Sequence, residues 1–294
     1  MDLKRLQTFL AVAEAGSLSA AADRLRIAQP ALSRQIRILE GEVGQTLFAR
    51  SREGMALTAA GKLLQARVSG LLRQLEQGVE DVRSMEEAPQ GKVAVGLVPS
   101  AAAVIGAELA LAVHAAHPGI RLSLQQGYTS HLLGWLHRGE IDMALVYRSG
   151  GQLPAEDMVR EELLLVGPEG HPLLEAPAEF AALDGQRMVL PSAENGLRLI
   201  VDQAAERAGI RFDVLAESAA FQLLLELVAK GMGLSILPRS AVAGMAAAGR
   251  FGWTGFAPPL HRDIQLVLPH GARRSRAVEA VLPILRRTVL ERLG

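Results

Sequence analysis

Apolar residues near the start of the chain recur at the three- and four-residue spacing of amphipathic helices. The first set consists of Leu3, Leu6, Phe9, Leu10 and Ala13. The second set consists of Leu18, Ala21, Ala22 and Leu25. We predict two short helices, with Ser19 as the N-cap of the second because serine is a preferred capping residue. The pattern breaks at residues 26–28, which indicates a short turn.

A third helix is predicted to open at Gln29 and Pro30, because proline is tolerated in the first turn of a helix. Its apolar face carries Leu32, Ile36 and Leu39, and its polar face carries Gln29, Ser33, Arg34 and Arg37. Arginine and glutamine can pair with the edges of guanine and adenine in the major groove, and serine can contact a base or a phosphate. The polar face is therefore a candidate DNA-reading surface, with an ordinary solvated helix hairpin as the alternative.

Two short apolar segments, residues 47–50 and 55–57, flank a turn at Glu53 and Gly54 and predict a β-hairpin. Arg50 and Arg52 lie in this hairpin, where they would contact a phosphate backbone. Residues 24–52 contain six arginines and two acidic residues, although the formal net charge of the whole chain is +0. This local positive surplus favours contact with nucleic acid.

Residues 59–88 predict one long helix, since no proline interrupts them and Thr58 is a natural N-cap. Apolar residues continue along it at helical spacing. They are Leu64, Val68, Leu71, Leu75, Val79 and Val82. This stripe could pack on its own domain, but a long helix leaving a small domain has little of its own chain to pack on.

Beyond a break at residues 88–91, strand-like and helix-like segments alternate. The predicted strands are residues 92–97, 120–124, 141–147, 163–166, 187–190, 212–215, 233–238 and 266–268. The predicted helices are residues 101–116, 131–137, 197–208, 221–230 and 275–293. Such alternation predicts parallel sheets covered by helices.

The composition fits a cytoplasmic protein with two domains. The chain has 294 residues, of which 49% are hydrophobic, so it can build full cores. It has no cysteine, which excludes disulfides, thiolate metal sites and a cysteine nucleophile. Its first residues lack the pattern of a signal peptide. The most apolar stretch, residues 101–116, is interrupted by Glu108 and His114 and is expected to be too short to span a bilayer.

The N-terminal region closely resembles the winged helix-turn-helix of LysR-type transcriptional regulators. The matching segments are residues 9–22, 29–36, 47–50 and 57–61, together with Leu25, Leu39 and Glu40. So many fixed spacings argue against chance agreement. The sequence departs from the family pattern at Ala28, where the family often has serine. A side-chain cap on the third helix is therefore expected to be absent.

This resemblance implies a DNA-binding surface made of Gln29, Pro30, Ser33, Arg34 and Arg37, with Arg50 and Arg52 in the wing. It also implies that the long helix pairs antiparallel with that of a second copy. The dimer seam would consist of Leu64, Val68, Leu71, Leu75, Val79 and Val82. A homodimer or homotetramer would then bind double-stranded DNA at an interrupted palindromic operator, and RNA polymerase is a further candidate partner.

The remaining chain resembles the effector domain of the same family, in which two Rossmann-like α/β lobes form a fold like that of periplasmic binding proteins. The expected domains are a winged helix-turn-helix at 1–58, a linker helix at 59–90 and an effector domain at 91–294. Lobe I would comprise 91–161 and 263–294, and lobe II would comprise 162–262, with crossings near Glu161 and Arg262. Residues 190–202 resemble a subgroup linked to nitrogen-assimilation control.

Ligands of such folds bind in a cleft at the carboxyl ends of strands. The resemblance gives six candidate contacts for the effector, which are Ser100, Thr129, Arg148, Ser192, Asn195 and Phe221. Ser100 begins a helix whose free N–H groups favour an anion, so we expect a small polar or anionic metabolite. The alternative for each polar residue is an ordinary role as a cap or in a loop.

The sequence contains no dinucleotide-binding glycine motif, no P-loop and no nucleophile elbow, so we expect no enzymatic activity. We also expect no cofactor and no metal. The prediction is a ligand-responsive, sequence-specific transcriptional regulator. The alternative is a cytoplasmic solute-binding or enzymatic α/β protein whose N-terminal helices serve only assembly.

Overall fold

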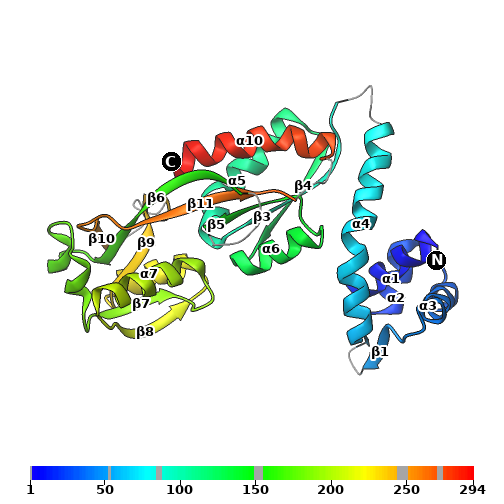
Figure 1. Ribbon diagram of the computed structural model, residues 1–294, viewed down its shortest axis with the longest axis horizontal. Helices are drawn as coiled ribbons and strands as arrows, with labels where there is room; N and C mark the ends of the chain where they lie inside the picture. The colour runs from blue at the N-terminus through cyan, green and yellow to red at the C-terminus, as the bar shows by residue number, and fades with distance from the viewer. Residues whose placement is uncertain (1, 52–53, 84–87, 149–154, 244–250, 270–273) are drawn as a thin grey trace. The chain divides into compact units, whose positions relative to one another are not determined.

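The three helices expected at the start of the chain are α1 (Leu3–Ala15), α2 (Leu18–Leu25) and α3 (Gln29–Val43) in Figure 1. The computed structural model describes residues 2–51, 54–83, 88–148, 155–243, 251–269 and 274–294.

The predicted N-cap of α2 was wrong, because the Ala20 N–H donates to the Ser17 hydroxyl at 3.1 Å. Helix α2 begins at Leu18, so Ser19 already belongs to its first turn.

The turn between α2 and α3 ends one helix and starts the next without a side-chain cap. Arg26 adopts a left-handed backbone with φ of 54°, and its N–H donates to the carbonyl of Ala22. Few residues other than glycine, asparagine and aspartate adopt this conformation. No side chain caps α3 at Ala28, as expected, and Pro30 lies in its first turn.

The predicted hairpin consists of β1 (Phe48–Ser51) and β2 (Gly54–Leu57), which pair antiparallel with Phe48 opposite Leu57. The Met55 N–H donates to the carbonyl of Gly16 at 2.7 Å, so the hairpin is attached to the end of α1. Gly54 has φ of +129°, and a Cβ there would lie 2.4 Å from the same carbonyl oxygen. Only glycine fits this close approach.

The long helix α4 (Ala59–Arg83) begins as predicted, because the Gly61 N–H donates to the Thr58 hydroxyl at 3.0 Å. The end of the predicted helix falls partly on residues 84–87, outside the described residues. Apolar side chains of α1, α2, α3, β1 and α4 form one core. Its buried members are Leu6, Phe9, Val12, Ala21, Ala22, Leu32, Ile36, Leu39, Leu47, Phe48, Val68 and Leu72. Residues 1–83 with 138–140 form one compact unit, so α4 belongs to the N-terminal unit.

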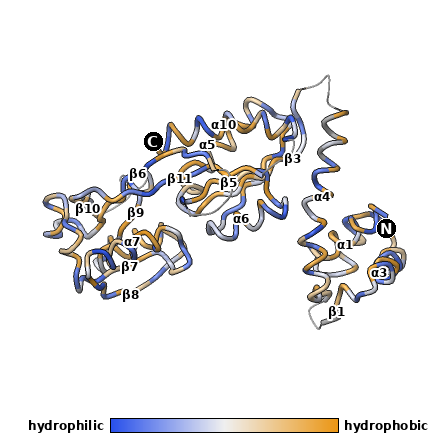
Figure 2. Tube along the Cα trace, viewed as in Figure 1, coloured by the Kyte–Doolittle hydropathy of each residue, from blue (hydrophilic) through white to orange (hydrophobic). Residues whose placement is uncertain are grey.

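The second unit, residues 84–137 with 141–294, begins with a parallel α/β lobe. Its elements are β3 (Gly91–Leu97), α5 (Pro99–Ala116), β4 (Ile120–Gln126), α6 (Thr129–His137), β5 (Met143–Tyr147) and α10 (Arg276–Leu293). Strand β3 lies between β4 and β5 and is parallel to both. Helices α5 and α10 cover one face of this sheet and α6 covers the other (Figure 1). Strands β3 and β5 are coloured mostly as hydrophobic in Figure 2, as expected for strands covered on both faces.

Helix α5 has 18 residues, and its length and composition alone would allow it to cross a membrane. The expectation that this stretch is too short was wrong by this measure, because the helix begins at Pro99 rather than Ala101. Its side chains Ile105, Leu109 and Val113 are buried in the core of the lobe. This packing is that of a core helix.

The second lobe combines the remaining helices and strands. They are β6 (Ala155–Pro168), the 3₁₀ turns η1 (Pro172–Leu174) and η2 (Phe180–Leu183), β7 (Arg187–Pro191), α7 (Gly196–Ala208), β8 (Asp213–Ser218), α8 (Phe221–Ala229), β9 (Ser235–Pro238), α9 (Arg239–Ala243), β10 (Phe251–Thr254) and β11 (His261–Val267). Strands β7 and β8 are parallel, as predicted. Strand β10 and helix α9 were not predicted.

Strands β6 and β11 cross between the lobes, and both are longer than predicted. They pair antiparallel with Glu161 opposite Arg262, and β11 also pairs antiparallel with β5. Strands β9 and β10 pair antiparallel with β6. The predicted parallel sheets are present in both lobes, in β3, β4 and β5 and in β7 and β8. The crossing strands add antiparallel pairs to them, which the sequence did not predict.

Candidate DNA-binding face and effector cleft

Helix α3 presents polar side chains on the side opposite its buried residues. Leu32 and Leu39 are fully buried, whereas Gln29, Arg34 and Arg37 are exposed. Pro30 is exposed and Ser33 is partly exposed, with its Oγ 3.5 Å from the Arg37 guanidinium. The side chains predicted to read DNA therefore share one solvent-facing side of one helix.

The acidic residues around this helix are already engaged elsewhere. The Glu40 carboxylate accepts hydrogen bonds from the N–H groups of Leu47 and Phe48, at 2.8 and 3.3 Å, and so fixes the start of the wing. Glu42 forms an ion pair with Arg5 of α1. In the described part of the chain, no carboxylate pairs with Arg34 or Arg37. Both charges are thus available to a base edge or a phosphate.

The wing is described only in part. Arg50 lies in β1, but its side chain and the whole of Arg52 lie outside the described residues. Their contacts with DNA stay predictions. The described strands β1 and β2 are antiparallel and follow α3 in the chain, as the strands of a wing do.

The apolar stripe of α4 is divided between two environments. Val68 is buried in the N-terminal core, and Leu64 packs against that core. The remaining stripe residues, Leu71, Leu75, Val79 and Val82, are between 52% and 68% exposed. The exposed part of the stripe is the surface on which a second copy of α4 would pack, and its pairing stays a prediction.

A narrow cleft lies between the two lobes of the second unit. Three of the six predicted effector residues line it, namely Ser100, Asn195 and Phe221. Tyr147 and Ser218 also line it, and sequence analysis did not find them. Its free volume is about 10 Å³, which is room for about one water molecule.

Three helices begin at this cleft. Ser100 lies in the first turn of α5, Asn195 is the N-cap of α7, and α8 begins at Phe221. The Asn195 side-chain oxygen accepts the Leu197 N–H at 3.0 Å. The first N–H groups of a helix have no partner within it, and the end of the helix carries a partial positive charge. Three such ends favour an anionic or acceptor group in the cleft.

The other three predicted residues do not line the cleft. Thr129 begins α6, and its buried hydroxyl has no hydrogen-bond partner among the described residues. Ser192 is partly exposed, and its N–H donates to the Ser218 carbonyl at 3.2 Å. Arg148 is half exposed and forms ion pairs with Asp157, at 2.7 Å, and Asp263, at 3.1 Å. A hydrogen bond from Gln265 and the nearby Arg148 lower the pKa of Asp157.

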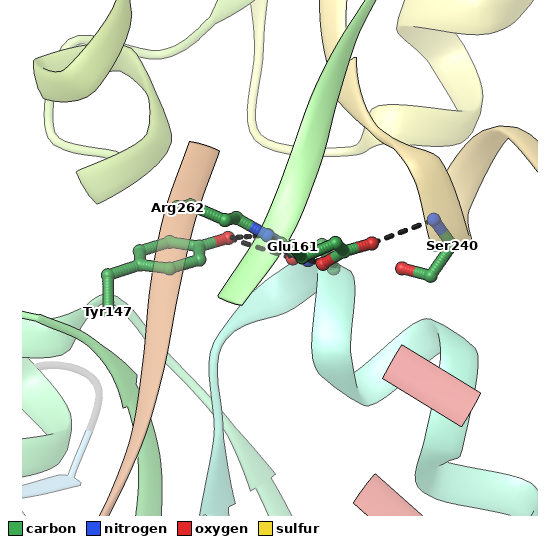
Figure 3. A network of polar contacts seen from close by, with 5 residues as sticks. Tyr147, Glu161, Ser240 and Arg262 are labelled. Atoms are coloured by element: carbon green, nitrogen blue, oxygen red, sulfur yellow. Dashed lines mark hydrogen bonds and ion pairs between the residues drawn. The ribbon is translucent and has the colours of Figure 1, made fainter. Parts of the chain in front are cut away.

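A buried ion pair between the crossing strands adjoins the cleft (Figure 3). Arg262 and Glu161 are only 1% and 4% exposed. The Arg262 Nε donates to Glu161 Oε2 at 2.8 Å, and Nη2 donates to the same oxygen. Glu161 Oε1 accepts the Ser240 N–H at 2.7 Å. The pair thus ties both crossing strands to the start of α9.

The other side of the guanidinium faces the two hydroxyls of the cleft. Arg262 Nη1 donates to Ser100 Oγ at 2.7 Å and to Tyr147 Oη at 2.8 Å, and the two hydroxyl oxygens lie 2.8 Å apart. The guanidinium carbon also lies 5.1 Å from the centre of the Tyr147 ring, within cation–π range. Ser100 is therefore part of a buried network that sequence analysis did not predict.

These features define the class of protein. The chain combines a winged helix-turn-helix with exposed arginines on its reading helix and a two-lobed α/β domain with an anion-favouring cleft. This is the architecture of a ligand-responsive transcriptional regulator. The chain belongs to the LysR family, because the model of the bacterial regulatory helix-turn-helix protein, lysR family, matches residues 3–62. The model of the LysR substrate binding domain matches residues 86–289.

Curated relatives agree with this assignment. The chain is 33% identical to the nitrogen assimilation regulatory protein nac of Escherichia coli K12 over 290 residues, which cover 97% of this chain and 94% of the relative. It is 31% identical to the protein of the same name from Klebsiella aerogenes, over 95% of this chain and 92% of that protein. These similarities confirm the resemblance to the family and to its nitrogen-assimilation subgroup.

Solved structures show the same fold. A full-length variant of OxyR from Pseudomonas aeruginosa has a TM-score of 0.77 at 22% identity, covering 98% of this chain and 94% of that one. CbnR in complex with its target DNA has a TM-score of 0.70 at 23% identity, covering 98% of this chain and all of that one.

LysR family members are oligomeric, DNA-binding transcriptional regulators that bind small-molecule effectors, and they are not enzymes. The alternative of an enzyme or solute-binding protein was therefore wrong.

Proposed function

We propose that this regulator senses a small polar or anionic metabolite, which binds in the cleft beside Ser100. The observation that carries this proposal is the meeting of three helix N-termini at the cleft, those of α5, α7 and α8. Such ends attract negative charge. Phe221 and Leu224 supply an apolar wall for the rest of the ligand.

The DNA-bound form is proposed to be a homodimer or a pair of dimers in the cytoplasm. Helix α3 would lie in the major groove of each half-site of an interrupted palindrome, with the wing on the phosphate backbone. The exposed stripe of α4 would hold the two reading helices at one spacing. RNA polymerase is the further partner proposed for such a regulator.

The effector can act only if it binds one arrangement of the lobes or subunits better than another. The cleft as it stands has room for about one water molecule, with a free volume of about 10 Å³. A metabolite must therefore move the lobes or the lining side chains when it binds. This requirement couples occupancy of the cleft to the arrangement of the protein.

The test separates effector response from DNA binding. Chromatin immunoprecipitation with sequencing first identifies the bound operators, and a reporter is then placed under one of them. Ser100→Ala should abolish the response of the reporter to growth conditions, while gel-shift assays still detect operator binding. Alanine is chosen because a larger side chain would crowd Arg262, which donates to Ser100 at 2.7 Å. Ser192→Ala is the matched control, because Ser192 does not line the cleft. In this variant the reporter should respond as it does in the wild type.

Two outcomes would contradict the proposal. Loss of operator binding together with the response would give Ser100 a structural role. A normal response of Ser100→Ala would place the effector elsewhere.

A further inference from the structure

We propose that Tyr147 shares the effector contact with Ser100, and that the buried Arg262–Glu161 pair orients both hydroxyls so that they offer the effector a hydrogen-bond donor. The end of the effector that reaches them is then an oxygen acceptor of the carboxylate or oxyanion class. This inference rests on the proposed function, because it assigns chemistry to the same cleft.

The Arg262 guanidinium decides which way the two hydroxyls bond. A guanidinium donates and never accepts, so both hydroxyl oxygens must accept from Nη1. The hydroxyls of Ser100 and Tyr147 are 2.8 Å apart, and one of them donates to the other. The hydroxyl that accepts this bond also accepts one from Arg262, so both lone pairs of its oxygen are used. The hydrogen of that same hydroxyl has no partner among Ser100, Tyr147 and Arg262. Ser100 and Tyr147 both line the cleft.

Glu161 keeps this arrangement fixed. Its Oε2 accepts two hydrogen bonds from Arg262, and its Oε1 accepts the Ser240 N–H. The carboxylate thus holds the guanidinium with Nη1 turned toward the hydroxyls, as Figure 3 shows for Tyr147. Both charges are buried, so bulk water does not compete for them.

The other polar side chains of the cleft also offer donors. Asn195 uses its oxygen to cap α7, which leaves its NH₂ group for another partner. The Ser218 hydroxyl accepts the Ala220 N–H and donates to the Ala220 carbonyl, so its hydrogen is used. Among the described residues that line the cleft, none is acidic or basic. An acceptor-rich group therefore finds donors there, whereas an ammonium group finds no carboxylate among the described lining residues.

The experiment measures binding of simple probes to the full-length protein by saturation-transfer NMR, which suits large assemblies. The probes are straight-chain carboxylates from acetate to hexanoate and alkylammonium ions of the same chain lengths. The wild type should bind the carboxylates and discriminate against the ammonium ions. Absence of carboxylate binding at every chain length, or equal binding of the ammonium ions, would overturn the proposal.

The chain offers a matched pair of variants, because it contains only two tyrosines. Tyr147→Phe keeps the ring over Arg262 and removes the hydroxyl. Carboxylate binding should then weaken by about tenfold or more, the loss of a hydrogen bond to a charged group. Tyr128→Phe should bind as the wild type does, because Tyr128 stacks on His131 and does not line the cleft.

A double variant tests the role of the ion pair. Replacing both Glu161 and Arg262 by methionine removes two buried charges together, which proteins tolerate better than the loss of one partner. The hydroxyls remain but are no longer oriented, so the preference for carboxylate over ammonium should fall by about tenfold. A merely structural pair would change the thermal midpoint without changing this preference.

The variants also separate the two proposals. If Ser100→Ala and Tyr147→Phe both leave probe binding unchanged, the cleft is not the effector site and the proposed function fails as well. If Ser100→Ala weakens carboxylate binding but Tyr147→Phe and the double variant do not, only the present inference fails.

Discussion

Arg34 illustrates how the charge of one residue decides what its side chain can do. It is exposed on α3, and no carboxylate pairs with it among the described residues. Arg34→Ala should weaken binding to the preferred operator by about 1–3 kcal/mol and relax the base preference at one position, because a bidentate contact to guanine is lost. Footprinting and gel-shift titration on a selected operator measure both effects.

Arg24 provides the control for Arg34. Its guanidinium forms an ion pair with Glu14 at 2.6 Å, so its charge is already balanced. Arg24→Ala should keep the base preference of the wild type. Unchanged operator binding by Arg34→Ala would remove that residue from the reading face.

Arg52 is predicted to contact the phosphate backbone rather than a base. Its position in the wing is predicted from the sequence, and it lies outside the described residues. Arg52→Ala should weaken binding to all DNA sequences alike and flatten the salt dependence, because each phosphate contact releases counterions. Titrations at several salt concentrations on specific and unrelated DNA measure this slope, and a loss confined to one operator would contradict the assignment.

The sequence predicts residues whose chemistry is visible locally and misses those that depend on a distant partner. Leu32, Ile36 and Leu39 follow helical spacing, and their burial is confirmed. Tyr147 ends an apolar strand and looks like any core residue in the sequence. Arg262 and Glu161 are 101 residues apart, and a lone charge is costly to bury, so sequence analysis found no reason to bury either one.

At the scale of elements, one part of α4 packs in the N-terminal core and another part is exposed. Val68 and Leu72 pack inside the N-terminal core, while Leu71, Leu75, Val79 and Val82 remain exposed. The four-residue and three-residue spacing predicted one continuous stripe. The sequence could not show where that stripe leaves its own domain, because both environments favour the same apolar residues.

The double substitution Leu71→Glu with Leu75→Glu should open the dimer and collapse operator affinity. It would place carboxylates in an apolar interface, where unpaired burial is strongly unfavourable, and the two half-sites would no longer be held at one spacing. Multi-angle light scattering measures the assembly. Leu63→Glu is the control, since Leu63 is as exposed as Leu71, at 60% each, but lies outside the predicted seam. A wild-type mass for the double variant would refute the seam.

The crossing strands show the limit of pattern analysis at this scale. The first half of β6 is rich in charged residues, including Glu156, Asp157 and Arg160, and has no apolar run. It forms a strand because β11 pairs with it, from His261 opposite Glu162 to Val267 opposite Ala155. Hydrogen bonds to a distant strand thus override a local pattern that favours a loop.

At the scale of the whole molecule, the two units have separate cores that share no residue. Leu39 is fully buried in the N-terminal core, and Leu109 is fully buried in the core of the second unit. Both tryptophans, Trp135 and Trp253, lie in the second unit. Tryptophan fluorescence therefore reports unfolding of the second unit alone, whereas far-UV circular dichroism reports both units.

Leu39→Ala should destabilise the N-terminal unit by about 2–5 kcal/mol, because it leaves a cavity in a closed core. Heating should then separate the two signals. The circular dichroism of the variant should begin to change at a lower temperature than that of the wild type, whereas its unfolding midpoint by fluorescence should equal that of the wild type. Leu109→Ala should do the reverse and lower the fluorescence midpoint. If Leu39→Ala lowered the fluorescence midpoint as far as the dichroism midpoint, the units would unfold as one. The effector would then act on the reading helix through cooperative coupling of the two units rather than through rearrangement of separately folded ones.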